Sequence, residues 1–308
     1  MRVDRTVTTA IDPELCTGCG LCIEVCPSET ITLLHGKAVV SGKESLNCGH
    51  CAAVCPTGAV AVGAIDPDMS AFQTFQEETT WSPHGRYDTA ALVNLMRSRR
   101  SCRNFRQQPV ARDILEDLIR IGITAPSGSN CQMWTFTVLP DPAAVRALAA
   151  RIGDFFRKLN RLAQKKWLRK LLKGVGRPEL DHYYRNHFES IARGLLQWDN
   201  GGRDLLFHNA PAAIVVAAKN QASCPAEDAL LATQNILLAA HSMGLGTCLI
   251  GFAIAAMHRS DEIKALLRLP ADETPYAVIA LGYPREKYQR VTGRKKATVR
   301  YIDFISPP

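Results

Sequence analysis

Cysteine thiols are the first candidates for chemistry in this chain of 308 residues. Seven of its eleven cysteines lie within the first 55 residues. The stretch from Met1 to Arg5 lacks the apolar core of a secretory signal, so we expect a cytoplasmic protein, in which disulfides are rare. The clustered cysteines are therefore interpreted as metal ligands. They are Cys16, Cys19, Cys22, Cys26, Cys48, Cys51 and Cys55.

The first four cysteines follow the spacing Cys16-x2-Cys19-x2-Cys22-x3-Cys26, and Pro27 comes directly after them. This spacing is typical of bacterial iron–sulfur sites, in which three close thiolates bind one cubane cluster and the fourth binds another. Zinc is the alternative, but zinc sites usually pair two Cys-x2-Cys units across a longer gap. The run therefore predicts an iron–sulfur cluster.

A second run, Ser45-x2-Cys48-x2-Cys51-x3-Cys55-Pro56, repeats the first with serine at the first ligand position. Together the two runs resemble the bacterial two-cluster ferredoxins, over about residues 8–65. The resemblance implies one [4Fe–4S] cluster bound by Cys16, Cys19, Cys22 and Cys55, and a second cluster bound by Cys26, Cys48 and Cys51. The fourth ligand of the second cluster stays open: Ser45 could bind iron, a three-iron cluster could form, or water or His50 could complete the site.

The remainder of the chain has neither a G-x-G-x-x-G loop after a strand nor a Walker sequence. Residues 98–105 instead read Ser-Arg-Arg-Ser-Cys-Arg-Asn-Phe. Three guanidiniums and a hydroxyl within five residues suit a phosphate and a ribityl chain, because arginine binds anions through several donors. Two loops accompany this segment: a polar loop over 125–134 that enters a strand, and an apolar, glycine-bounded loop over 245–251.

Taken together, these segments resemble the nitroreductase-like FMN flavoproteins over roughly residues 89–305. The specific elements are R-R-S-x-R-x-F and P-S-x-x-N-x-Q-x-W, although Met133 stands where the family usually has proline. The family forms intertwined homodimers with FMN at the subunit interface, and the resemblance implies the same here. The implied FMN-binding residues are Arg99, Arg100, Ser101, Arg103, Asn130, Gln132, Ile250, Gly251, Arg294 and Lys295.

These sites require a framework, and the composition, 46% hydrophobic and 21% charged, is that of a globular protein. We expect an α+β chain: a ferredoxin-like iron–sulfur domain over 1–66, a linker over 67–88, and a nitroreductase-like domain over 89–308. The resemblance implies a central, mainly antiparallel sheet flanked by helices in the larger domain. Apolar patterns predict strands at 30–34, 59–62, 134–139, 213–217 and 277–281, and a helix over 228–243 that ends at Gly244.

Positive charge is concentrated in one segment. Residues 146–177 contain 11 basic residues and one acid, whereas the whole chain has a net charge of +8. The basic character is therefore local and is poor evidence for nucleic-acid binding over the whole surface. No apolar stretch is long enough to span a membrane.

Apolar spacing over 151–175 predicts one amphipathic helix with a cationic outer face, within a basic insert at about 146–205. Four roles stay open for this insert. It could be a helix packed on the core with a solvated face, or a lid over the flavin. It could also bind a membrane surface or nucleic acid, since a basic amphipathic helix permits both. Docking of an acidic electron donor, such as a separate ferredoxin, is compatible with the first two roles.

The combined pattern predicts an FMN-dependent oxidoreductase fused to its own ferredoxin module. Electrons would enter singly at the clusters, pass to FMN and reduce an organic acceptor such as a nitroaromatic or a quinone. NAD(P)H is a further candidate donor, and no catalytic side chain is assigned because FMN carries the chemistry. The alternatives are a dehydrogenase that passes electrons outward to ferredoxin and a non-enzymatic redox relay or sensor. Cys102, Cys131 and Cys248, beside the flavin motifs, are interpreted as buried fillers.

Overall fold

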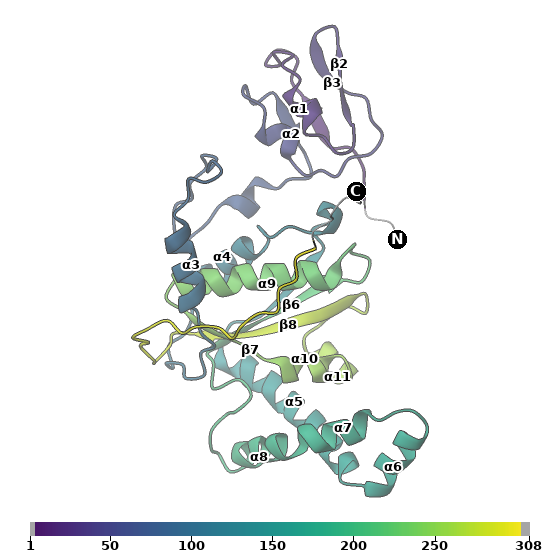
Figure 1. The fold of residues 1–308 in the computed structure, drawn as a ribbon, viewed down its shortest axis with the longest axis vertical. Helices are drawn as coiled ribbons and strands as arrows, with labels where there is room; N and C mark the ends of the chain where they lie inside the picture. Colours follow the sequence, from purple (N-terminus) through teal and green to yellow (C-terminus); the bar gives the residue numbers. More distant parts are fainter. Residues whose placement is uncertain (1–3, 303–308) are drawn as a thin grey trace, which may run out of the picture.

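The computed structural model describes residues 4–302, which form three regions along the long axis of the molecule (Figure 1). The cysteine-rich region lies at one end, a helix-covered sheet occupies the middle, and a group of helices from the basic insert lies at the other end. The expected mixture of helices with antiparallel sheets is confirmed. No helix in the described range is long and apolar enough to cross a membrane.

The cysteine-rich region is built from short elements around its own small core. Two antiparallel strand pairs flank two helical turns, and the buried side chains include Ile31, Ala38 and Val60. The strands expected at 30–34 and 59–62 are confirmed to within one residue. The elements are β1 (Thr9–Ile11) paired with β4 (Val60–Val62), β2 (Ile31–Leu34) paired with β3 (Lys37–Val40), α1 (Leu21–Glu24) and α2 (His50–Ala53).

The segment that connects the two regions docks on the body of the protein. After the 3-10 turn η1 (Pro67–Ser70), Gln73 and Thr74 meet helix α4 (Arg112–Gly122). The fully buried carboxylate of Asp117 accepts hydrogen bonds from the backbone N–H of Gln73 (2.9 Å) and of Thr74 (2.7 Å), and from the Thr74 hydroxyl (2.6 Å). These contacts tether the linker to α4.

The central sheet has the strand order β5-β6-β8-β7, and every neighbouring pair is antiparallel. Side chains of β6 alternate between two hydrophobic cores, as the two-residue period of a strand requires. Ile214 and Val216 face the core with α4 and α9 (Pro225–Ser242), whereas Ala213 and Val215 face the core with α5 (Pro142–Ala163) and α10 (Gly251–Met257). The strands are β5 (Trp134–Leu139), β6 (Ala212–Lys219), β7 (Gly246–Leu249) and β8 (Glu273–Gly282).

Helices cover both faces of this sheet (Figure 1). The helix expected over 228–243 is α9 (Pro225–Ser242), and Gly244 follows it at φ 81°, a left-handed conformation that favours glycine. The other helices of the layers are α3 (Thr89–Ser98), capped by Asp88, α10 (Gly251–Met257) and α11 (Asp261–Leu266).

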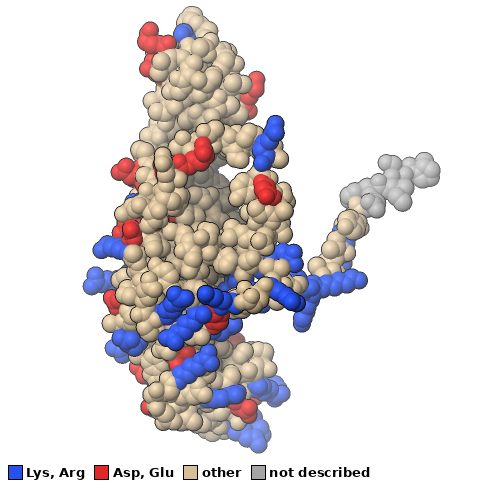
Figure 2. Space-filling model, turned by 90° about the vertical axis from the view of Figure 1, so that its left-hand side faces the viewer, with Lys and Arg blue, Asp and Glu red and all other residues tan. Residues whose placement is uncertain are grey.

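The basic insert differs from the single helix expected over 151–175, so that prediction was wrong. Helix α5 (Pro142–Ala163) ends where its buried stripe of Ile152, Phe156 and Ala163 gives way to charged residues, and α6 (Lys166–Gly174) begins after a break. Two more helices follow, α7 (Glu179–Asn186) and α8 (Phe188–Asp199). Figure 2 shows many Lys and Arg side chains over this half of the molecule.

Candidate functional site

The cysteines of the first region line two separate small cavities. Among residues 4–302, no group of three His, Cys, Asp or Glu side chains is placed to hold a single metal ion. Thiols that line a cavity suit a cluster with one thiolate at each corner. Cys16, Cys19, Cys22 and Cys55 line the first cavity, and Cys26, Cys48, Cys51, Ser45 and His50 line the second. This division is the one expected from the sequence.

Backbone N–H groups point at several of these sulfurs. The Sγ atoms of Cys16, Cys26 and Cys55 accept hydrogen bonds from the backbone N–H groups that lie 3.4, 3.3 and 3.2 Å away, respectively. The bond from Ala38 lowers the pKa of Cys16. Such donors favour the thiolate, which is the form that binds iron.

Tight turns at glycines shape the cysteine-rich region. Gly18 has φ 72°, and a Cβ at that position would lie 2.0 Å from the carbonyl oxygen of Gly36. Only glycine fits there, because any side chain would overlap the backbone of the turn between β2 and β3. Gly20 and Gly49 precede α1 and α2 with φ 78° and 75°, so both helical turns begin in the same way.

Ser45 lies buried in the second cavity, at the position where the first run has a cysteine. Its Oγ accepts a hydrogen bond from the Asn47 N–H (3.0 Å), and its own N–H donates to the carbonyl of Arg5 (2.9 Å). His50 is exposed at the start of α2. Both side chains remain candidates for the fourth ligand position.

Residues 98–105, hereafter the arginine segment, form a site suited to an anion. Burial lowers the pKa of Arg99, and the neighbouring guanidiniums of Arg294 and Arg100 lower it further. Among the described residues, none of these three cations has a carboxylate partner in an ion pair. An external anion among these cations would offset their mutual repulsion, and a phosphate suits this role.

The arginine segment is fixed by the edge of the central sheet. Ser101 forms a bridge with Thr247 of β7, and the N–H of Cys102 donates to the Thr247 carbonyl (2.8 Å). Burial raises the pKa of the Cys102 thiol to about 11 and also raises the pKa of Cys248. Both groups are therefore neutral at pH 7, in agreement with their interpretation as fillers.

Ile250 and Gly251 occupy the turn between β7 and α10. The N–H of Ile250 donates to the Val278 carbonyl (2.9 Å), which leaves the exposed Gly251 at the start of the helix. Arg103 and Lys295 are exposed as well. Arg103, Ile250 and Gly251 lie at the same edge of the sheet as Arg99.

Residues 127–132, hereafter the amide loop, lie apart from the arginine segment and against the cysteine-rich region. Ser129, Asn130 and Gln132 all have positive φ, between 47° and 56°. The Asn130 Nδ2 donates to the carbonyl oxygens of Leu46 (3.0 Å) and Asn47 (3.2 Å), between Ser45 and Cys48 of the second cavity. The expected FMN contact Asn130 therefore also touches the second cysteine loop, which no local sequence pattern signals.

The sheet register separates the amide loop from the arginine segment. On one side, Ser101 pairs with Thr247 of β7, which lies opposite Leu281 near the end of β8. On the other side, Trp134 of β5 aligns across β6 with Thr274, near the start of β8. These positions lie about 23 Å apart along β8, and β5 and β7 are about 14 Å apart across the sheet. Within one chain the two motifs are thus roughly 25–30 Å apart.

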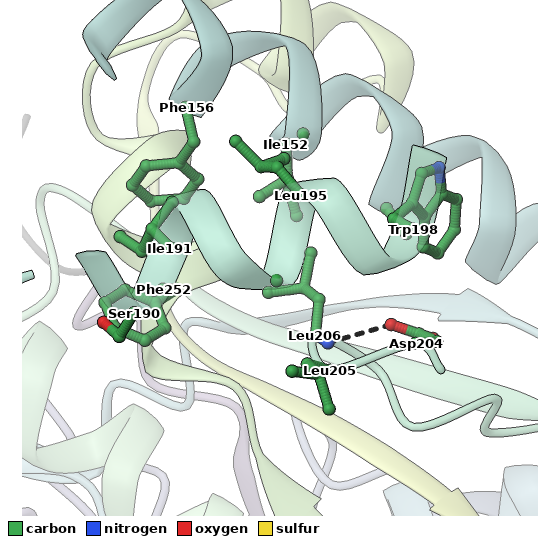
Figure 3. Close-up of a pocket in the computed structure, with 13 residues that line it drawn as sticks. Ile152, Phe156, Ser190, Ile191, Leu195, Trp198, Asp204, Leu205, Leu206 and Phe252 are labelled. Carbon is green, nitrogen blue, oxygen red and sulfur yellow. Dashed lines mark hydrogen bonds between the residues drawn. The ribbon is translucent and has the colours of Figure 1, made fainter. Parts of the chain in front are cut away.

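An apolar cavity of about 270 Å³ lies between α5, α8, the loop at 204–206 and the start of α10 (Figure 3). Phe252, which follows Gly251, forms one wall of the cavity. The Asp204 carboxylate holds the loop beside it, because it accepts the N–H of Leu206 (2.8 Å) and of Phe207 (3.0 Å). Most of the remaining lining is apolar and includes Ile152 and Phe156 of α5 and Ile191, Leu195 and Trp198 of α8.

Aromatic side chains of the insert surround Phe252. The rings of Phe156 and His187 each lie 5.9 Å from the Phe252 ring, edge to face. Tyr183 packs on Phe156 and donates its hydroxyl to Asn160 (2.6 Å), and burial raises the pKa of Tyr183 to about 12. Helices α7 and α8 are therefore attached to the start of α10 by aromatic packing.

Comparison with known proteins gives two family matches. Residues 96–283 match the Nitroreductase family, and residues 9–32 match a 4Fe-4S binding domain. The first match covers more than half of the chain and contains all the expected flavin motifs except Arg294 and Lys295.

Individual relatives agree with these matches. An iodotyrosine deiodinase from Haliscomenobacter hydrossis is 25% identical, over 64% of this chain and 81% of its own. A 4-nitrobenzoate reductase from Nocardioides sp. is 27% identical, over 70% of this chain and 90% of its own. A solved nitroreductase with bound FMN from Bacteroides fragilis shares the fold with a TM-score of 0.51, at 23% identity, over 69% of this chain and 98% of its own.

Proposed function

Because the chain belongs to the nitroreductase family of FMN-dependent oxidoreductases, we propose that it carries electrons from its own iron–sulfur clusters to FMN and on to an organic acceptor. The observation that carries this proposal is the contact of Asn130 with the carbonyls of Leu46 and Asn47. That contact joins a loop of the flavin motif to the loop of the second cysteine cavity. FMN can store two electrons, so it would link one-electron carriers to a two-electron reduction.

The arginine segment is the proposed site of the FMN phosphate. The Arg294 guanidinium is close enough to lower the pKa of Arg99, and a phosphate dianion beside both would offset this repulsion. Arg100, Ser101, Arg103 and Lys295 would supply further donors. The backbone of Ile250 and Gly251 would border the ring system, as the resemblance implies.

The two cysteine cavities are the proposed cluster sites. Cys16, Cys19, Cys22 and Cys55 supply four thiols for a complete [4Fe–4S] cluster in the first. The second has three thiols and Ser45, so its cluster would be either serine-ligated or short of one iron.

A homodimer is proposed because one chain holds only part of each flavin site. The arginine segment and the amide loop are roughly 25–30 Å apart within a chain. FMN is shorter than this, so an FMN in contact with both motifs would lie between two chains.

Exposed apolar residues support a partner chain. Leu92, Val93 and Met96 of α3 and Leu230 and Leu231 of the adjacent α9 are exposed, and such a patch is typical of an interface. The described chain before residue 303 is also exposed and leaves the body of the molecule as an arm (Figure 2).

The acceptor is proposed to be an apolar aromatic compound such as a nitroaromatic or a quinone. The cavity beside Phe252 supports this choice, because its walls are almost entirely apolar and its aromatic rings could pack on a flat substrate. Helix α8 supplies much of the lining, which favours a lid role for this part of the insert.

The test is anaerobic purification followed by assays of FMN, iron and donor preference. We expect both cofactors to co-purify, and the flavin absorbance to bleach when reduced ferredoxin is added. Bleaching by NAD(P)H alone, at an equal rate in a chain with Cys16→Ala and Cys48→Ala, would show that the clusters are not on the electron path.

A further inference from the structure

We infer that the second cluster of each chain delivers its electrons to the FMN anchored on the partner chain, not to the FMN of its own chain. This inference rests on the proposed function and specifies its route. Each transfer moves one electron and oxidises the cluster by one electron. Two transfers, with two protons from water, reduce one FMN, and a low-potential one-electron donor such as reduced ferredoxin restores the clusters.

The exit point is identified by a hydrogen-bonded contact. The loop of the second cavity is hydrogen-bonded to the amide loop. Asn130 of the amide loop donates to the carbonyls of Leu46 and Asn47. Its Oδ1 in turn accepts from the Nε2 of Gln132 (3.0 Å). A continuous polar path therefore leads from the residues between Ser45 and Cys48 to the exposed Gln132 side chain. Of the two cavities, the one that contains Ser45 meets the flavin motif.

The linker holds this contact in place. Its N–H groups and the Thr74 hydroxyl bond to the buried Asp117 of α4, and Arg120 of the same helix donates to the carbonyl of Ala71 (2.8 Å). The linker therefore holds the cysteine-rich region against the amide loop of its own chain. This region cannot swing to its own arginine segment without breaking both sets of contacts.

The sheet geometry then selects the partner's flavin. The arginine segment of the same chain lies at the opposite edge and the opposite end of the sheet, roughly 25–30 Å from the start of β5. Even Ile250 and Gly251, beside the expected ring position, follow the edge strand β7, about 14 Å across the sheet from β5. The rate of electron transfer falls steeply with distance, so a flavin that touches the amide loop from the partner chain is favoured.

Heterodimers with two affinity tags test the route, because two arrangements of the same defects give opposite predictions. In the separated pair, one chain carries Cys48→Ala and Cys51→Ala, and the other carries Arg99→Ala and Arg103→Ala. In the combined pair, one chain carries all four substitutions and its partner is unchanged. Each pair should bind one FMN per dimer and should retain one intact second cluster.

The readouts are the fluorescence lifetime of the oxidised FMN, which a nearby cluster shortens, and the rate of flavin bleaching by limiting dithionite. Delivery to the partner's FMN predicts a shorter lifetime and at least tenfold faster bleaching in the separated pair. The reverse result, with the combined pair faster, would overturn the inference and leave the proposed function intact. A third outcome would overturn the proposed function itself. In that outcome, flavin bleaching is equally slow in both pairs, in a dimer without either second cluster and in the unsubstituted dimer.

The comparison of the separated and combined pairs holds even if Cys48→Ala and Cys51→Ala disturb the fold of the cysteine-rich region. Both pairs contain the same damaged region, and only its distribution between the chains differs. FMN and iron content per dimer, measured first, verifies that the two pairs are matched.

Discussion

The carboxylate of Asp117 holds the linker on α4, and Asp117→Asn is expected to release it. The side chain is fully buried and accepts three hydrogen bonds, from the N–H of Gln73 and from the N–H and hydroxyl of Thr74. Asparagine keeps one oxygen acceptor but replaces the other with an NH2 group, which cannot accept a hydrogen bond from the linker. The substitution also removes the negative charge that strengthens all three bonds.

The expected loss follows from this change in bonding. A hydrogen bond to a charged group contributes about 1.5–3 kcal/mol, and one between neutral groups about 0.5–1.5 kcal/mol. Replacing three hydrogen bonds to a charged carboxylate by two hydrogen bonds between neutral groups weakens the attachment of the linker by about 4 kcal/mol. The population of chains with an open linker should then rise roughly a thousandfold.

The same carboxylate makes the attachment sensitive to acid. Burial alone raises the pKa of Asp117, but the hydrogen bonds from Thr74 and Gln73 outweigh it, so the pKa lies below its usual value. A lowered pKa in the folded state contributes stability that is complete above the unfolded pKa of about 3.9 and is lost as pH falls through the folded pKa. The wild-type linker should therefore open only in acid, and Asp117→Asn should remove this dependence.

Native-state cleavage by chymotrypsin measures the opening, because Phe72 and Phe75 lie in the docked segment. At pH 7 we expect much faster cleavage at these two sites in Asp117→Asn. The matched control is Glu116→Gln on the same helix, whose half-exposed side chain also bonds to Gln73 and should change cleavage less than threefold. Equal cleavage of Asp117→Asn and wild type would refute the tether.

Three further predictions concern the cofactor and acceptor sites. Arg99→Ala should weaken FMN binding about tenfold to a hundredfold through loss of charge-assisted phosphate bonds, whereas Arg97→Ala, outside the motif, should leave it unchanged. Equilibrium dialysis measures both, and equal affinities would contradict the phosphate assignment. Ser45→Cys should raise iron from about seven to about eight atoms per chain if the wild-type second cluster lacks one iron. Full iron in the wild type that is lost in Ser45→Ala would instead indicate serine ligation. Ile191→Trp should fill part of the cavity beside Phe252 and lower kcat/KM for aromatic acceptors about tenfold at constant FMN content; unchanged kinetics would place the acceptor elsewhere.

Local signals in the sequence were sufficient for much of the fold. The strand Trp134–Leu139 is an unbroken run of aromatic, β-branched and apolar residues, and its predicted limits are those observed. The end of α9 was predictable because Gly244 marks a left-handed turn. The strands β1 and β3 were missed because runs of three or four residues carry too little pattern. The loop predicted over 245–251 was wrong for the same reason, because four of its residues form the short strand β7.

Contacts between distant segments were beyond such signals. Asn130 was expected to contact FMN, but its bonds to Leu46 and Asn47 join positions more than 80 residues apart. The break between α5 and α6 depends on which side chains the core accommodates, so the apolar spacing alone suggested one helix. Asp117 offered one usable signal, since a carboxylate beside Leu118 in an otherwise apolar helical stripe requires a buried partner.

The claim that the clusters and FMN form one electron path is tested most directly by watching the clusters lose their electrons. The protein is reduced fully with dithionite, freed of excess reductant and mixed with a quinone, and the cluster EPR signal is followed in time. We predict rapid loss of the signal in the wild type. Retention of the signal is expected in the FMN-depleted chain with Arg99→Ala and Arg294→Ala. Equally rapid loss without FMN would contradict the account, because the clusters would then reach the acceptor without the flavin.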